Sequence, residues 1–180
     1  MSARIVQLPL DRETARELMA GERAFLRGTL YTARDAAHKR LFAMLDAGEP
    51  LPVDLRDACF YYTGPCPAAL GEVIGPCGPT TSSRMDMYTP RLIELGLTAM
   101  IGKGPRAKTV VDAMRDNGAV YFAATGGAGM LIAKSVRACR LVAFEDLGPE
   151  AIYALTVHDF PAVVAVDAAG NSLYDNHFKA

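Results

Sequence analysis

The 180-residue sequence lacks the features that point directly to a membrane or a nucleic acid. No apolar run is long enough to cross a bilayer. The first 21 residues have no secretory apolar core, because charges and Pro9 interrupt them early. The net charge is -1, from 19 basic and 20 acidic residues, which favours neither a nucleic acid nor a membrane surface as a partner. We therefore expect a cytoplasmic protein that binds any anion through a few placed groups.

Side chains that bind metal ions are scarce. The three histidines are not paired with acidic residues, which argues against a histidine-based metal site. The four cysteines, Cys59, Cys66, Cys77 and Cys139, contain no CxxC pair, and in a reducing compartment we expect free thiols. Cys66 and Cys77 lie beside prolines, so a metal or cluster role for them remains a weak alternative. No Ser-His-Asp pattern stands out.

The composition is that of one folded domain, which we expect to span residues 1–180. The hydrophobic fraction is 51% and the charged fraction 22%. The last third alternates strand-like and helix-like segments, whereas the first third is richer in strands, so we predict an α/β fold with a mixed sheet and flanking helices. Strand patterns cover 4–10, 24–33, 51–55, 58–64, 97–102, 119–125, 139–145 and 161–171, and helix patterns cover 11–21, 32–45, 105–118, 126–136, 148–157 and a segment from 89.

Capping residues predict where the helices begin and end. A side-chain oxygen before a helix satisfies free N–H groups of the first turn, proline suits the first helical position, and glycine suits the residue after the last. On this basis Asp11, Thr32 and Thr89 are predicted N-caps, Pro90 and Pro105 begin their helices, and Gly21 and Gly118 end theirs.

A row of hydroxyl side chains, "GPTTSSRM" at 78–85, is the first candidate site. We interpret residues 73–85 as a strand end, a rigid turn and a helix start, where free N–H groups and the helix dipole favour an anion. Thr80, Thr81, Ser82 and Ser83 add neutral donors, and Arg84 adds a fork that matches a carboxylate. The alternative is that one hydroxyl caps the helix and the others face water.

Two glycine-rich turns follow predicted strands. In "GKGPRAK" the glycines let the chain bend beside Lys103, at the strand end where open α/β sheets bind ligands. The spacing is not that of a phosphate-binding P-loop, and an exposed turn lysine is the equal alternative. In "ATGGAGM" tight packing is the preferred interpretation, although Thr125 can still face a site.

A third turn, "YTARDAAHKR", places a cation at the start of a helix. Arg34 lies where a strand passes into the helix, much as Arg84 does, and His38 is one turn further along on the same face. The residues do not decide whether His38 is catalytic or supports Arg34, and a packed histidine is the commoner case.

Together, "TARDAAHKR", "GPTTSSRMD", "IGKG", "ATGGAG" and "DFPAVVAVDAAGN" occur in the order and spacing of one known subunit type. The chain resembles the β subunit of class I fumarase and L(+)-tartrate dehydratase, which is equivalent to the C-terminal domain of single-chain class I fumarases. The resemblance implies a swivelling β/β/α domain. It also implies an α2β2 assembly in which a 4Fe-4S cluster is held by the α subunit and not by this chain.

The same resemblance implies a reaction and a set of residues. The reaction is the reversible hydration of a small dicarboxylate, fumarate to malate, with L(+)-tartrate or a mesaconate-type compound as alternative substrates. Thr80 takes part in proton transfer, Thr81 and Arg84 hold a substrate carboxylate, Lys103 binds the same dicarboxylate, and Arg34 lines the site and polarises the threonine. His38, Ser82 and Thr125 are candidate supporting residues. A dicarboxylate-binding module without chemistry, or a purely structural domain, is the alternative outside enzymes.

Overall fold

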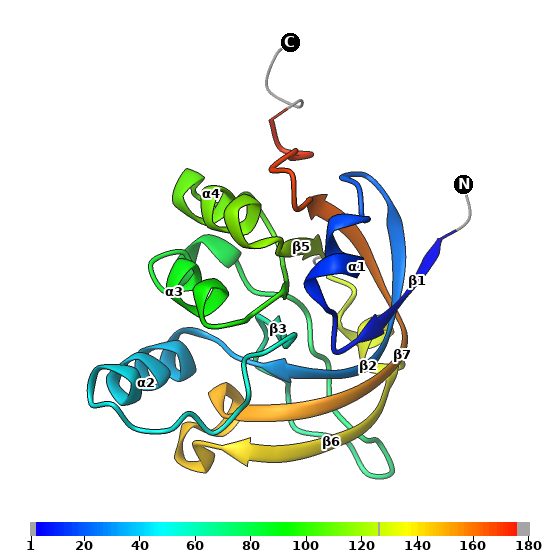
Figure 1. The fold of residues 1–180 in the computed structure, drawn as a ribbon. Helices are drawn as coiled ribbons and strands as arrows, with labels where there is room; N and C mark the ends of the chain where they lie inside the picture. The colour runs from blue at the N-terminus through cyan, green and yellow to red at the C-terminus, as the bar shows by residue number, and fades with distance from the viewer. Residues whose placement is uncertain (1–2, 126, 176–180) are drawn as a thin grey trace.

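The computed structural model describes residues 3–125 and 127–175. Within them it contains β1 (Arg4–Leu8), β2 (Arg23–Thr32), β3 (Cys59–Tyr61), β4 (Ala99–Gly102), β5 (Val120–Ala123), β6 (Val136–Ala143) and β7 (Ile152–Val166). The α-helices are α1 (Arg12–Arg16), α2 (Asp35–Asp46), α3 (Thr89–Glu94), α4 (Lys108–Asn117) and α5 (Gly129–Ala133). Two 3-10 turns, η1 (Ser82–Met85) and η2 (Glu145–Glu150), complete the elements (Figure 1). None of the helices in the described residues has both the length and the hydrophobicity that crossing a membrane requires.

The seven strands form one mixed sheet that partly closes into a barrel. β2, β3, β4 and β5 are parallel neighbours in that order. β7 runs antiparallel to both β5 and β2, so it closes a ring of five strands. β1 pairs with β2, and β6 pairs with β7. The predicted mixed sheet with flanking helices is confirmed.

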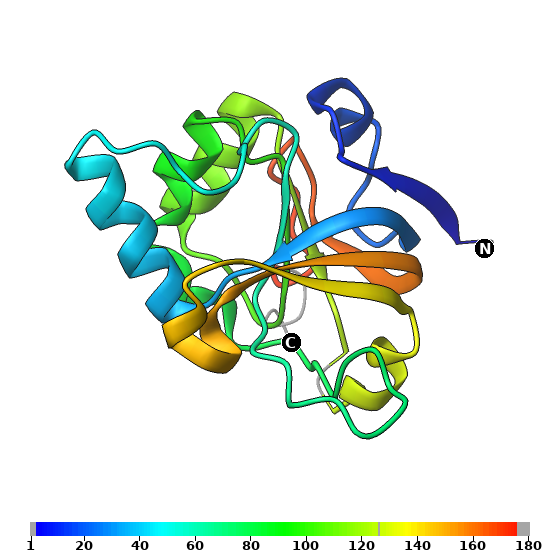
Figure 2. The ribbon, with the colours of Figure 1, turned by 90° about the horizontal axis from the view of Figure 1, so that it is seen from below.

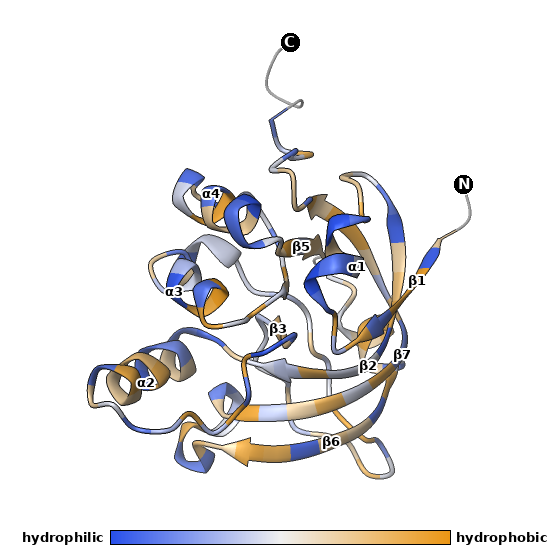
Figure 3. Cartoon of the chain, in the orientation of Figure 1, coloured by the Kyte–Doolittle hydropathy of each residue, from blue (hydrophilic) through white to orange (hydrophobic). Residues whose placement is uncertain are grey.

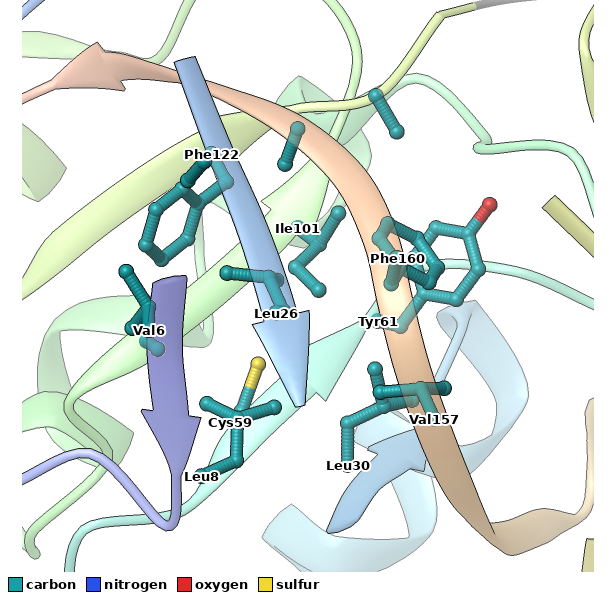
Figure 4. Close-up of a cluster of buried hydrophobic side chains, with 14 of the residues drawn as sticks. Val6, Leu8, Leu26, Leu30, Cys59, Tyr61, Ile101, Phe122, Val157 and Phe160 are labelled. Carbon is teal, nitrogen blue, oxygen red and sulfur yellow. The ribbon is translucent and has the colours of Figure 1, made fainter. Parts of the chain in front are cut away.

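The parallel strands bury side chains on both faces, because residues along a strand point alternately to opposite sides. On β3, Cys59 and Tyr61 join a cluster with Leu26, Phe122 and Phe160, which Figure 4 shows gathered among the strands. Phe60 and Tyr62 belong to a second cluster, which α2, α3 and α4 cover.

The three helices lie on the same side of the strands, as the two ribbon views show (Figures 1 and 2). In Figure 3 the short strands β3 and β5 have the hydrophobic colour, whereas α2 and α4 are mixed in colour because one side of each faces solvent. The helices therefore supply one layer of the fold.

Two predicted elements are wrong. Residues 51–55 form no strand, although Val53 and Leu55 are buried as single anchors in the helix-side cluster. Residues 148–157 are not a helix, because β7 begins at Ile152 and continues to Val166 with β2 on one side and β6 on the other. These pairings outweigh the local helical preference of the segment. β6 begins three residues earlier than the predicted strand.

The predicted helix ends are correct in part. Asp11 caps α1 by accepting from Thr14 N at 2.8 Å, and Gly118 ends α4 with a φ of 74°. Pro90 lies in the first turn of α3, as predicted. Four predictions are wrong: Thr89 is the first residue of α3 and Tyr88 its N-cap, Gly21 lies beyond the end of α1, α4 begins at Lys108 rather than at Pro105, and Thr32 does not cap α2. Its hydroxyl instead donates to Ala151 O and accepts from Tyr153 N, which ties β2 to β7.

Candidate functional site at the ends of the parallel strands

Four parallel strands deliver side chains to one edge of the sheet. β2 ends at Thr32 and is followed by Arg34, β4 ends at Gly102 and is followed by Lys103, and β5 ends shortly before Thr125. Because β2, β3, β4 and β5 are parallel neighbours, their carboxyl ends meet at the same edge. This is the edge at which open α/β sheets bind ligands.

The hydroxyl row lies across this edge, between the ends of β3 and β4. Thr80 N donates to Tyr62 O at 2.7 Å, and Ser82 N donates to Lys103 O at 2.9 Å. Thr81 forms an isolated parallel bridge with Lys103. The structure therefore brings Thr80 and Thr81 together with Lys103. Thr81 and Lys103 are exposed at this edge, and Thr80 is half-buried.

The predicted strand end in this row is wrong, and the predicted helix start is a 3-10 turn rather than an α-helix. No strand precedes it among residues 73–79, and η1 is a four-residue 3-10 turn from Ser82 to Met85. The N–H groups of Thr80 and Ser82 are already used by carbonyl groups of neighbouring segments. Anion binding at this row therefore depends on side chains rather than on a helix dipole.

Ser82 is a support of the loop rather than a group open to solvent. Its side chain is buried, and its Oγ lies 2.8 Å from Tyr121 Oη, which in turn donates to Gly104 O at 2.9 Å. Because a carbonyl can only accept, the Tyr121 proton goes to Gly104, and Ser82 donates to Tyr121. A Cβ at Gly102 would lie 1.9 Å from Ser82 Oγ, so this glycine is required for close packing. The bend itself falls at Gly104, with a φ of 84°.

A buried arginine, Arg106, fastens the lysine turn to the hydroxyl loop. Its side chain is 0% exposed, its Nε donates to Asp86 Oδ1 at 2.7 Å, and its Nη2 donates to Thr89 Oγ1 at 2.8 Å. Asp86 Oδ2 also accepts from Ala107 N at 2.7 Å. A buried ion pair with these extra hydrogen bonds holds two loops in one arrangement.

Two carboxylates flank the arginines of the candidate site. Arg84 Nε donates to Asp35 Oδ1 at 2.8 Å, and Arg34 Nε lies 3.1 Å from Glu150 Oε1. Arg34 also packs over Gly64, since a Cβ there would lie 3.1 Å from Arg34 Nη1. Gly64 comes shortly after the end of β3, and the Tyr62 carbonyl that accepts from Thr80 N belongs to the residue directly after β3. Arg34 and Thr80 therefore lie beside the same strand end.

His38 and Thr125 do not join this group of exposed side chains. His38 is fully buried, and its Nδ1 lies 2.8 Å from Arg34 O. Burial among Phe60, Tyr62 and Tyr88 lowers its pKa to about 4, so the ring is neutral near pH 7. Thr125 is exposed and lines a small cavity at the side of β7, away from the hydroxyl row.

The described residues do not form a binding site for an iron–sulfur cluster. All four cysteines are free, with Cys59 and Cys77 buried. Burial raises the pKa of the Cys77 thiol to about 12 and raises the pKa of Cys139 as well. In residues 3–125 and 127–175, no three histidine, cysteine or acidic side chains are placed to hold a metal ion. The thiols of this chain therefore do not fit a 4Fe-4S cluster.

Sequence reasoning did not find the supporting residues of the site. Their roles arise from pairing across the fold, as for Asp35 and Arg84, whose positions in the sequence differ by 49. The missed residues are Asp35, Glu150, Tyr121, Asp86 and Arg106. A local signal existed only for Asp35, which follows Arg34, and for Asp86, which lies close to Arg84.

The fold and this edge define a class of protein. Two arginines, a lysine and two threonine hydroxyls gather at the carboxyl ends of parallel strands, an arrangement suited to binding a small anion with more than one carboxylate.

Comparison with known proteins identifies the family of the chain. The family described as "Fumarase C-terminus" matches residues 2–177, and the chain belongs to this family. The resemblance inferred from the sequence is confirmed.

Three relatives show how the family is organised. The chain is 39% identical to the putative L(+)-tartrate dehydratase subunit beta of Methanocaldococcus jannaschii, over 92% of this chain and 88% of that protein. It is 39% identical to fumarate hydratase 2 of Leishmania major, over 92% of this chain but 30% of that protein. It is 40% identical to the anaerobic class I fumarate hydratase of Escherichia coli, over 84% of this chain and 28% of that protein. The chain thus spans under a third of the two fumarate hydratases.

Proposed function

We propose that this chain is the β subunit of a two-chain hydro-lyase that catalyses the reversible hydration of fumarate to malate. The observation that carries the proposal is the convergence of Arg34, Thr80, Thr81, Arg84 and Lys103 at one sheet edge in a chain of the fumarase C-terminus family. The match over 88% of a protein named as a beta subunit supports the two-chain organisation. The single domain over residues 1–180, its swivelling β/β/α class and a cytoplasmic location are parts of the same proposal.

Substrate binding is the task that these cations suit best. A dicarboxylate carries two negative charges, and a guanidinium fork binds a carboxylate through two hydrogen bonds. Arg84 with Thr81 would hold one carboxylate, and Lys103 would attract the same dianion as a point charge. Fixing both ends of the substrate places the C–H bond next to a carboxylate against the proton acceptor.

Proton transfer is assigned to Thr80. In the dehydration direction a proton leaves one carbon and a hydroxyl group leaves its neighbour as the double bond forms. A threonine hydroxyl is a weak base at its ordinary pKa, so it needs help, and the Arg34 guanidinium at the same strand end is the group that would favour the deprotonated oxygen. His38 supports the backbone of Arg34 from the buried side.

The partner is an α subunit that carries the 4Fe-4S cluster, in an α2β2 assembly. The cluster is assigned to the partner because the thiols of this chain do not fit it. The longer fumarate hydratases, of which this chain covers about 30%, have the length for such a part within one polypeptide. No step of the reaction on this chain is derived through the cluster.

Anaerobic reconstitution with the α partner tests the function. Fumarate, mesaconate and L(+)-tartrate would be assayed in parallel, and the mass of the complex would be measured. We expect turnover of fumarate that needs both chains and falls by about 100- to 10,000-fold in Thr80→Ala, the range for loss of an acid–base group. Thr109→Ala, an exposed threonine on α4, is the matched control. No turnover of any of the three by a loaded, assembled complex would refute the proposal.

A further inference from the structure

Asp35 lies between the two arginines of the candidate site. Its Oδ1 accepts a hydrogen bond from Arg84 Nε at 2.8 Å, and its Oδ2 lies 3.8 Å from Arg34 Nε. The arginines belong to different elements, since Arg34 directly precedes α2 and Arg84 lies in η1. One carboxylate therefore links two cations that the chain brings from distant parts of the sequence.

The contacts use Nε and leave the terminal nitrogens available. Among the described residues, the hydrogen bonds of Arg84 involve Nε alone. Arg34 likewise approaches both carboxylates through Nε, Asp35 at 3.8 Å and Glu150 at 3.1 Å. A guanidinium that is fixed at Nε keeps the Nη1–Nη2 edge, which can bind a second carboxylate as a fork.

Stability does not explain this arrangement. The Arg84 side chain is 51% exposed and that of Asp35 is 33% exposed, and ion pairs so open to solvent contribute about 0–1 kcal/mol. In addition, Arg34 Nε and Asp35 Oδ2 are shielded from solvent without a hydrogen bond to any described residue. Leaving such groups unsatisfied costs free energy, so a functional reason for the geometry is expected.

The rigid partner in the contact is Asp35. It is the first residue of α2, where the helix dipole favours a carboxylate, and α2 is fixed by the buried residues Ala37 and Leu41. Arg84, by contrast, lies on a four-residue turn. Asp35 therefore fixes the position of the Arg84 guanidinium, rather than the reverse.

We propose that Asp35 is a positioning residue, which holds Arg84 at Nε so that the terminal nitrogens of Arg84 face a carboxylate of one small dicarboxylate. The inference rests on the proposed function, in which Arg84 binds a carboxylate of the substrate. Charge alone would act in the opposite direction, because a negative group near a dianion weakens its binding. The sign of the change in KM on removing Asp35 therefore separates positioning from charge balance.

The kinetic test uses the reconstituted two-chain enzyme. In Asp35→Ala we expect KM to rise about tenfold or more while kcat changes less than threefold, because carboxylate binding is lost equally from the ground and transition states. Asp35→Asn keeps an oxygen that can accept from Arg84 Nε, so its KM should rise less. Asp46→Ala is the control, since Asp46 ends the same helix and pairs with Arg91 at 2.6 Å. An unchanged or lower KM in Asp35→Ala would overturn the proposal.

A second measurement keeps this inference separate from the proposed function. If the assembled wild-type enzyme turns over none of the substrates, the function fails, but the anchoring of Arg84 can still be measured in the isolated full chain. Nitrogen-15 NMR would follow exchange of the Arg84 Nε–H with water, with Arg84→Lys used to assign the signal. We expect about tenfold faster exchange in Asp35→Ala and no change in Asp46→Ala. Equal exchange in wild type and Asp35→Ala would refute the anchoring.

Discussion

His38 shows how one buried residue supports an exposed one. Its Nδ1 donates to Arg34 O, because a carbonyl can only accept, and this leaves Nε2 as a buried acceptor without a hydrogen-bond partner among the described residues. Phe60, Tyr62 and Tyr88 surround the ring. The unsatisfied Nε2 costs free energy, whereas the hydrogen bond of Nδ1 fixes the Arg34 carbonyl group at the point where β2 passes into α2.

The same residue makes stability depend on pH. The folded pKa of His38 is lowered from 6.5 to about 4, chiefly by burial, with the nearby Arg106 lowering it further and Asp35 raising it. Between these values the unfolded chain binds the proton and the folded chain does not, so stability is full above pH 6.5 and falls as the pH drops towards 4. The whole shift corresponds to about 3 kcal/mol.

Urea unfolding between pH 7.5 and pH 5 measures this effect. We expect the free energy of unfolding of the wild type to decrease with falling pH, and the decrease to be smaller by about 2 kcal/mol at pH 5 in His38→Gln. His158→Gln, at a half-exposed histidine, should keep the wild-type slope. If His38→Phe and His38→Gln both retain the full slope, another group is responsible and His38 is not held neutral.

At the scale of single residues, the sequence could reveal which candidate residues lie at the end of a strand. Arg34 and Lys103 were placed correctly because each follows a strand that local alternation identifies. Asp35, Glu150 and Arg106 could not be assigned roles, because their partners are set by how distant segments pack. The contact between Arg34 and Glu150 requires η2 to lie against the start of α2, which no local pattern encodes.

At the scale of elements, the prediction depended on whether local and tertiary preferences agree. β2, β4 and β5 and the end of α4 at Gly118 follow from alternation and capping. β7 was missed in its first half because "GPEAIYALTV" favours a helix locally, whereas its pairing with β2 and β6 decides the outcome. β2 lies far away in the sequence, and the pattern of the segment alone did not reveal that it pairs with the preceding strand β6.

Neighbouring residues of β7 provide a test of its strand geometry. Leu155 is fully buried and Thr156 is exposed, as expected for residues that point to opposite faces. We expect Leu155→Ala to lower the free energy of unfolding by about 2–5 kcal/mol, and Thr156→Ala by less than about 0.5 kcal/mol. Urea denaturation followed by circular dichroism measures both. Similar effects at the two positions would contradict the assignment of faces.

For the whole molecule, the parallel strands tie the two hydrophobic clusters together. β3, β4 and β5 each alternate between the cluster among the strands and the cluster under the helices: Ile101 belongs to the first and Met100 to the second. β7 then closes the ring by pairing with both β5 and β2. Neither cluster can lose its packing without disturbing strands that the other needs.

The chain should therefore unfold in one cooperative transition. Leu26→Ala removes a fully buried side chain from the first cluster and Met114→Ala one from the second. Each should lower the free energy of unfolding by about 2–5 kcal/mol without changing the urea m-value. Tyrosine fluorescence, which is usable because the sequence has no tryptophan, should give the same midpoint as circular dichroism. A variant whose two probes separate would show that the helix layer and the strands unfold as separate units, and that residues 1–180 are not one domain.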